Sequence, residues 1–151
     1  MNLLNILNWC DPIEILQIDH TSQHIQLRLA TRAPSACCPK CGQPSSRQHS
    51  HYPRKIADLP MAGKSVTVHL QLQRFFCDCT ACSQQTFTLR LSSVAEYARQ
   101  TARLQDQLVL IASQLGGRSG AKLASWLGMP ISRDILLRVL MRQKESTVAP
   151  P

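Results

Sequence analysis

The chain has 151 residues, 44% of them hydrophobic, which favours folding over disorder and allows one domain or two small ones. The formal net charge of +8 is uneven: residues 1–31 hold one arginine against three acids, whereas residues 32–151 hold 16 lysines and arginines against six acids. A basic body of this size favours a polyanionic partner, nucleic acid first, with a solvated basic surface as the alternative.

The start of the chain, MNLLNILNWCDP, lacks the features of a signal peptide, because no basic residue precedes its short apolar stretch and no small-residue cleavage site follows. No apolar run approaches the roughly 18 residues of a membrane span. We therefore expect a cytoplasmic, nucleoid-associated protein with no membrane partner. In a reducing compartment, the seven cysteines are better candidates for metal ligands than for disulfides.

Short apolar-rich runs predict strands in the first part of the chain. IEILQI (13–18) and HIQLRL (24–29) flank the turn-forming sequence DHTSQ and predict a hairpin. Residues 65–76 alternate apolar and polar side chains, which predicts a half-buried strand whose inner face holds Val66, Val68, Leu70 and Leu72. YPRKIA (52–57) is its expected partner, and TFTLRL (86–91) is a candidate for a further strand.

Two cysteine groups accompany these strands. CCPKCG (37–42) contains Cys38 and Cys41 with two residues between them, a spacing that lets two thiolates converge on one ion, and the Gly that follows suits the turn. RFFCDCTAC (74–82) lies about 35 residues further on and holds three cysteines. Two such groups predict a structural zinc site with four ligands. Buried free thiols and a redox pair are the alternatives, although a thioredoxin-like motif needs a βαβ setting that this sequence lacks.

Spacing alone leaves the second pair of ligands open. Cys79 and Cys82 repeat the two-residue spacing, and Cys77 and Cys82, with four residues between them, also lie within the observed range. The remaining cysteines and the nearest histidines are expected to be bystanders, with the histidines facing solvent or phosphate: Cys10, Cys37, His49 and His51. These features predict a small antiparallel β zinc-binding domain over residues 1–91, whose folding depends on the metal.

Helical spacing begins after residue 92. In residues 94–115 an apolar stripe of Leu104, Leu108, Ile111 and Leu115 predicts an amphipathic helix that ends at Gly116 and Gly117. A second short helix is expected over 119–127. A third opens at Ser132, a suitable N-cap, with an acid in its first turn. The fold class is thus α+β, with a helical domain over 92–144 and a linker-like tail over 145–151.

The last two helices form a helix-turn-helix pattern. Ala124 is expected to let them cross closely, Gly128 to allow the turn, and a shared core to hold Leu123, Leu127, Ile131, Leu136 and Leu140. In such a unit the last helix enters the major groove and its N-terminal residues meet base edges. The expected DNA-binding residues are Arg118, Lys122, Ser132, Arg133, Arg138 and Arg142, with Arg133 the best base contact and Arg118 and Lys122 suited to phosphates. A plain three-helix bundle with basic faces is the alternative.

The order of CPKCG, HSHYPRKIADLPMAGKSV, QRFFCDCTAC, AEYARQTARL and LGGRSGAKLASWLGMPISRDILLR resembles the N-terminal half of the ISL-three family of bacterial insertion-sequence transposases, over residues 37–142. In that family a zinc-binding domain precedes a helix-turn-helix, and the second cysteine pair has four intervening residues after an aromatic doublet. The resemblance implies the ligands Cys38, Cys41, Cys77 and Cys82 and leaves Cys79 as an extra thiol. Met61, Gln73 and Leu89 depart from the family's common residues.

Family transposases cut DNA with a downstream domain that carries three carboxylates. This chain ends at STVAPP and has nine acids, so we expect a truncated or separately expressed DNA-binding part that recognises terminal inverted repeats and does not catalyse alone. Its expected partners are double-stranded DNA and a second copy of itself or an intact transposase. An active nuclease, a zinc-stapled protein-interaction module and a transcriptional regulator are the competing interpretations.

Overall fold

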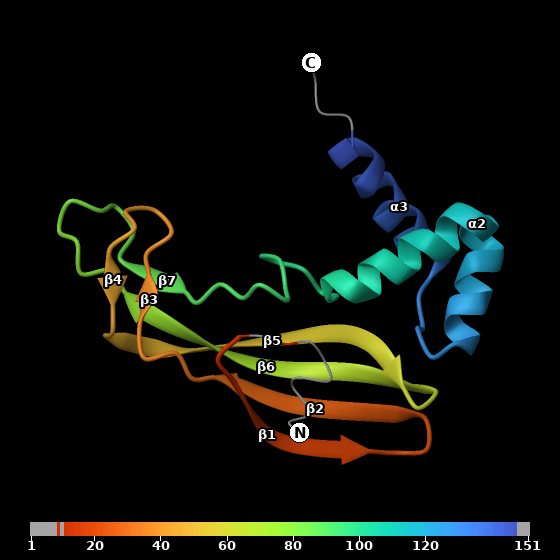
Figure 1. The fold of residues 1–151 in the computed structure, drawn as a ribbon, viewed down its shortest axis with the longest axis horizontal. Helices are drawn as coiled ribbons and strands as arrows, with labels where there is room; N and C mark the ends of the chain where they lie inside the picture. Colours follow the sequence, from red (N-terminus) through yellow and green to blue (C-terminus); the bar gives the residue numbers. More distant parts are fainter. Residues whose placement is uncertain (1–8, 10, 148–151) are drawn as a thin grey trace.

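The computed structural model of the chain describes residue 9 and residues 11–147, and it confirms the α+β class (Figure 1). A β-rich part is followed by helices. The elements are β1 (Ile13–His20), β2 (His24–Thr31), β3 (Ala36–Cys37), β4 (Pro44–Ser45), β5 (Gln48–Met61), β6 (Lys64–Phe76), β7 (Thr86–Thr88), α2 (Ala102–Trp126) and α3 (Arg133–Thr147).

The main sheet has the strand order β1-β2-β6-β5, with β7 pairing the end of β6. The predicted hairpin is present as β1 and β2, and the predicted partner strand lies within β5, where Tyr52 to Ala57 oppose Leu72 to Thr67 of β6. The predicted strand over 86–91 is shorter and stops at Thr88.

The expectation of a purely antiparallel sheet is wrong, because β2 and β6 pair in parallel from His24 opposite Ser65 to Ala30 opposite Gln71. Between β2 and β5 the chain makes a long excursion through the first cysteine group. Parallel strands need a long connection of this kind, because a tight turn joins only antiparallel strands.

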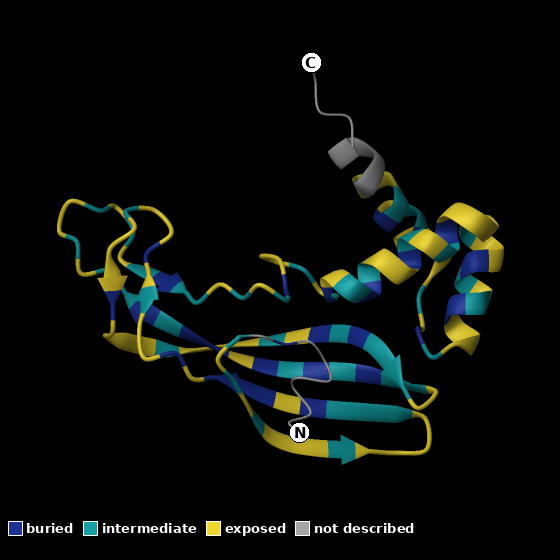
Figure 2. Cartoon of the chain, viewed as in Figure 1, coloured by how far each residue is buried: buried dark blue, intermediate teal, exposed yellow. Residues whose placement is uncertain are grey.

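One face of the main sheet holds the largest apolar core. The four inner residues predicted on β6 are each at most 3% exposed, and Leu27 and Leu29 of β2 lie beside them (Figure 2). Trp9 and Val94, which lie outside the strands, complete this core. The period-two alternation therefore identified the buried face correctly.

Residues 94–101 are not helical, so the predicted start of the first long helix is wrong. Helix α2 begins at Ala102, and Thr101 caps it by accepting a hydrogen bond from the backbone N–H of Leu104. Upstream, Val94 is 4% exposed in the sheet core and Gln100 forms an isolated bridge with Ala57. Packing against the sheet overrides the local helical propensity of this segment.

The predicted helix break at Gly116 is present as a kink inside α2. Gly116 has φ 70° and ψ −172°, a conformation that favours glycine, and a second helical stretch runs from 117 to Trp126. Ser132 then caps α3, its Oγ accepting from the backbone N–H of Ile135 at 3.4 Å. The chain thus has three helical stretches that change direction at the kink and again at residues 127–132 (Figure 1).

The helices share a separate apolar core made of Leu104, Leu108, Ala112, Ala124, Met129, Leu136 and Val139. Leu136 and Ala124 are buried as predicted, Ile131 and Leu140 pack against this core, and Leu123 is half-buried. The predictions for Leu115 and Leu127 are wrong, because these side chains are 46% and 48% exposed. Leu127 is the C-cap of α2, and Met129 occupies the inner position after the turn.

The helices also touch the sheet. Ala57 and Leu59 of β5 pack against the helical core, and the chain crosses the expected boundary at residue 91 without losing contact with β5. Helix α3 continues through Thr147, so the first three residues of the expected tail are helical, and 148–151 lie outside the described residues. None of the described helices is long and apolar enough to cross a membrane.

Candidate zinc centre and nucleic-acid surface

The first cysteine pair lies in a tight turn between β3 and β4, two short paired strands. The backbone N–H of Cys38 donates to the carbonyl of Gln43, and the N–H of Gly42 donates to the carbonyl of Cys38, each at 2.9 Å. Gly42 has φ +75°, so the turn uses the conformational freedom predicted for this glycine.

The second pair lies in the loop between β6 and β7. Cys77 directly follows β6, and its backbone N–H donates to the carbonyl of Gln85 at 2.8 Å, which keeps the start and end of the loop together. The N–H of Cys82 donates to the carbonyl of Cys79 at 3.1 Å. Cys79 is therefore a residue of the turn that returns Cys82 towards Cys77.

The structure brings Cys38, Cys41, Cys77 and Cys82 into one cluster whose sulfur atoms all lie within 4.8 Å of one another. The sulfurs of Cys41 and Cys77 are 3.5 Å apart. Four sulfurs around a tetrahedral zinc with bonds of about 2.3 Å lie about 3.8 Å apart, so this cluster fits a zinc ion. Cys79 lies outside the cluster. The four clustered cysteines are therefore the ligand set that the family resemblance implies.

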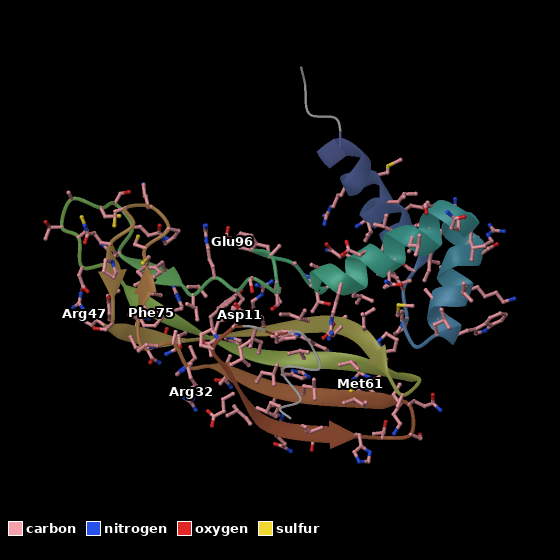
Figure 3. All side chains as sticks on the ribbon, in the orientation of Figure 1. Asp11, Arg32, Arg47, Met61, Phe75 and Glu96 are labelled. Carbon is pink, nitrogen blue, oxygen red and sulfur yellow. The ribbon has the colours of Figure 1, made fainter. Side chains whose placement is uncertain are left out.

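The cluster stands on a small apolar base. Cys38 is 1% exposed and packs with Phe75 and Phe87, whose rings stack with centroids 5.9 Å apart. Phe75 lies beneath the two cysteine-bearing loops, at the end of the sheet remote from the helices (Figure 3). A zinc ion bound here would therefore join two loops at one end of the molecule.

The other candidate ligands lie elsewhere. Cys37 is exposed, and Cys10 lies outside the described residues. The ring of His49 contacts the hydroxyl of Ser50 and the edge of Phe76, and His51 contacts Gln48. Neither histidine belongs to the cysteine cluster.

Backbone N–H groups near the sulfurs favour thiolates, but burial and neighbouring thiols oppose them at Cys41 and Cys77. The N–H of Cys41, assisted by that of Lys40, lowers the pKa of Cys38 to about 7 against the effect of burial. The N–H of Gln43 acts likewise on Cys41, but burial and the three neighbouring thiols outweigh it and raise the pKa of Cys41 to about 12. The N–H of Cys79 and the thiol of Cys41 lower the pKa of Cys77, but burial and the thiols of Cys38 and Cys82 outweigh them and raise it. Four thiolates at this distance would need a cation between them, and a bound zinc ion would supply it.

Fold and site together define a mixed α+β protein with a four-cysteine zinc site in its β-rich part. Residues 34–82 match the family model described as zinc-finger of transposase IS204/IS1001/IS1096/IS1165. This range includes all four clustered cysteines and ends before the helices. The match and the cluster identify zinc as the cofactor, and they indicate a transposase-type zinc domain. Neither the curated proteins nor the solved structures gave a match to this chain.

The residues predicted to bind DNA lie on the helices, away from the zinc site. Arg118 and Lys122 are exposed on the second stretch of α2, and Lys122 Nζ lies 5.0 Å from the ring centroid of Trp126. The rest are exposed at or within α3: Ser132, Arg133, Arg138 and Arg142. The structure thus gathers the six predicted residues on two adjacent helical stretches.

Two features were missed by the sequence interpretation. Asp58 is 3% exposed on β5 and accepts hydrogen bonds from the Thr101 hydroxyl and the Arg103 guanidinium, both at 2.7 Å. An aspartate inside the apolar stretch KIADLP was the available signal. The second feature is a basic groove that includes residues of YPRK and EYARQ, in each of which a tyrosine is followed two residues later by an arginine.

Proposed function

We propose that this chain is the DNA-binding N-terminal part of an insertion-sequence transposase, and that its helices recognise the element's terminal inverted repeats. The observation that carries the proposal is the exposed basic side of α3 and of the stretch before it, in a chain whose zinc domain matches a transposase family. The proposal includes the sequence-based expectation that this chain binds DNA without cutting it.

Close packing of the two helical stretches supports α3 as the reading helix. A Cβ added at Gly117 would lie 3.0 Å from Leu137 Cγ, and one added at Gly120 would lie 3.0 Å from Leu136 Cδ2. These glycines, together with Ala124, which is 0% exposed in the shared core, are compatible with the close crossing that the sequence interpretation assigned to alanine. The crossing holds α3 against one face of α2 and leaves its other side exposed, as a helix that enters the major groove requires.

The cations are placed for two kinds of contact. Arg133 is the first residue of α3, where the N-terminal residues of a recognition helix reach base edges. An arginine at this position can donate two hydrogen bonds to the edge of a guanine. Arg138 lies further along α3 and Lys122 on the preceding stretch, positions that suit phosphates on either side of the groove. Ile135, 45% exposed in the first turn, offers an apolar contact for a thymine methyl group.

A second candidate function is protein interaction. Trp126 is 74% exposed and Met141 is 67% exposed, and large exposed apolar side chains are typical of interfaces. A second copy of the chain or an intact transposase would be the partner. Sedimentation of the zinc-loaded chain with and without DNA separates a dimer that forms alone from one that forms only on DNA.

The proposal is tested by selecting duplexes from a random pool with the zinc-loaded chain and measuring affinities by fluorescence anisotropy. We expect a preferred sequence related to the ends of an insertion element. Arg133→Ala should reduce the preference at one or two base pairs by about 5- to 150-fold, whereas Lys122→Ala should weaken all sequences similarly. Equal affinity of wild type and Arg133→Ala for every duplex would contradict the proposal. Plasmid nicking with Mg²⁺ or Mn²⁺ tests the expectation of no cutting.

A further inference from the structure

A basic groove lies between the β-rich part and residues 89–99, away from the face of α3 described above. Its volume is about 1210 Å³, and its lining includes six cationic side chains and one acid, Glu96. The wall that carries Glu96 runs from β7 to α2 above the sheet (Figure 3). Such an excess of positive charge along a groove is complementary to a polyanion.

The groove is built into the fold rather than formed by a loose loop. At the start of the wall, the carboxylate of Asp11 accepts from the hydroxyls of Ser92 and Ser93 at 3.0 and 2.8 Å. In the middle, the Arg54 guanidinium donates to the carbonyls of Ala95 and Ala98. Beyond it, the wall ends in the bridge with β5 and the Thr101 cap. A groove held open in this way costs little ordering when a ligand binds.

Several of the groove's donors are not used inside the protein. In the described part of the chain, the exposed side chains of Lys55 and Arg99 have no hydrogen-bond or ion-pair partner. Arg74 donates through Nη2 to the Thr86 hydroxyl at 3.0 Å, but its buried Nε lacks an acceptor among the described residues. Arg90, by contrast, is paired with Glu96 at 2.9 Å. The exposed donors of Lys55 and Arg99 are therefore available for ligand oxygens, whereas the buried Arg74 Nε is not.

Two tyrosines distinguish this groove from a plain basic surface. Tyr97 is 92% exposed and has φ 59°, the left-handed region that a bulky side chain rarely adopts, and Tyr52 on the facing strand is 47% exposed. Backbone strain of this kind is retained where surrounding structure enforces it, often at binding sites. Exposed rings beside cations form the platform on which unpaired bases stack, whereas bases paired within a duplex cannot reach such rings.

We propose that this groove binds a single nucleic-acid strand, with Lys55 and Arg99 at the phosphates and Tyr97 stacked on a base. The proposal goes beyond the duplex recognition assigned to α3 and does not depend on it. The chemistry is common to single-stranded DNA and RNA, so the experiment includes both.

The test uses the full zinc-loaded chain with fluorescein-labelled oligothymidylate and oligouridylate, followed by anisotropy over a salt series. We expect binding of at least one strand, and the tighter of the two identifies the source. The double variant Lys55→Ala, Arg99→Ala should lower the slope of log affinity against log salt by about 1.4, since each lost phosphate contact is worth about 0.7. Arg28→Ala, which removes an exposed cation from β2 outside the groove, is the matched control and should change nothing. Failure of both strands to bind, or unchanged binding by the double variant, would overturn the proposal.

Tyr97 provides a separate readout. Tyr97→Ala should weaken strand binding by about 5- to 150-fold, and Tyr97→Phe, which keeps the ring, should bind like wild type. An oligonucleotide carrying 5-iodouracil should crosslink to Tyr97 or Tyr52 on irradiation. Crosslinks confined to α3 would place the strand elsewhere and overturn the assignment. Circular dichroism and zinc content show that each variant is folded.

Crossed measurements keep the two proposals apart. The groove variants should retain duplex affinity through α3, and Arg133→Ala should retain strand binding. A chain that binds duplexes but no strand contradicts the groove alone, and a chain that binds strands but no duplex contradicts the proposed function alone.

Discussion

Arg103 on the first turn of α2 donates through Nε to Oδ1 of Asp58 on β5 at 2.7 Å, and its second nitrogen contacts Oδ2. The carboxylate is 0% exposed, and it also accepts from the Thr101 hydroxyl and the Leu59 N–H. This two-point ion pair fixes the start of the helical part against the sheet. Because the carboxylate is buried, removal of Arg103 would leave a charge inside the protein without its counter-charge.

Arg103→Ala, which leaves the buried Asp58 carboxylate without its counter-charge, is therefore expected to lower the free energy of unfolding by about 3–5 kcal/mol. Arg32→Ala is the matched control, since it removes an ion pair with Glu14 in which both side chains are more than half exposed, and it should cost less than about 1 kcal/mol. Urea unfolding of the zinc-loaded proteins measures both. Equal losses in the two variants would show that the buried pair does not fasten the helices to the sheet.

The same pair predicts a pH dependence. Burial alone would raise the pKa of Asp58, but the hydrogen bonds from Arg103 and Thr101 and the charge of Arg103 outweigh it and hold the pKa below its ordinary value of 3.8. The stabilisation is present above the unfolded-state pKa and is lost as the pH falls through the lower folded-state pKa. The stability difference between wild type and Asp58→Asn should thus be constant from pH 7 to about 5 and shrink below about pH 4. A difference that grows on acidification would contradict this sign.

The zinc ligands are distinguished by comparing neighbouring cysteines. Cys77→Ser should reduce bound zinc from about one ion per chain to a small fraction, because it removes one of four ligands. Cys79→Ser and Cys37→Ser should keep about one ion, since these residues lie outside the cluster. Mass spectrometry of the metal content after dialysis gives the answer. Loss of zinc in Cys79→Ser together with its retention in Cys77→Ser would show that Cys79, and not Cys77, is the fourth ligand.

Removal of zinc should have a more local effect than the loss of the whole domain over residues 1–91 that the cysteine pattern predicts. The cysteine loops rest on their own small core around Phe75 and Phe87, while the main sheet and the helices have separate apolar cores. Chelation should therefore abolish amide protection in β3, β4 and the loop from 77 to 85, and leave protection in the helices. Hydrogen exchange followed by mass spectrometry measures this. Loss of protection throughout the chain would show that the metal controls the whole fold.

Two glycines with similar backbone angles are expected to differ in their tolerance of alanine. Gly63 has φ +74° with open space where a Cβ would lie, so Gly63→Ala should cost only about 1 kcal/mol of backbone strain. Gly128 has φ +87°, and its Cβ would lie 3.1 Å from Pro60 Cβ. Gly128→Ala should therefore cost about 2–4 kcal/mol, which includes the overpacking against the sheet. Similar melting shifts for both variants would argue against close contact between this turn and the β5–β6 hairpin.

The features predicted correctly from the sequence are those set by residues that lie close together along the chain. Alternation identified the buried face of β6, a glycine marked the kink at 116, and Ser132 marked the start of α3. The parallel pairing of β2 with β6 depends on contacts between distant segments, which local patterns do not encode. The same limit explains the late start of α2, because the burial of Val94 in the sheet core outweighs helical propensity.

The candidate sites show the same division. Spacing restricted the second zinc pair to two choices, and the family resemblance implied Cys77, which the fold then brings into the cluster. The groove could not be predicted, since Lys55 and Arg99 come together only when the wall of residues 89–99 lies along β5.

The central claim is that the helices bind duplex DNA through exposed cations, and a salt series on duplex binding tests it most directly. The affinity of the zinc-loaded chain should fall steeply with salt, and Lys122→Ala with Arg138→Ala should reduce the slope of log affinity against log salt by about 1.8, or 0.9 for each lost phosphate contact. A chain that binds no duplex at low ionic strength, or a slope that these two substitutions leave unchanged, would contradict the account.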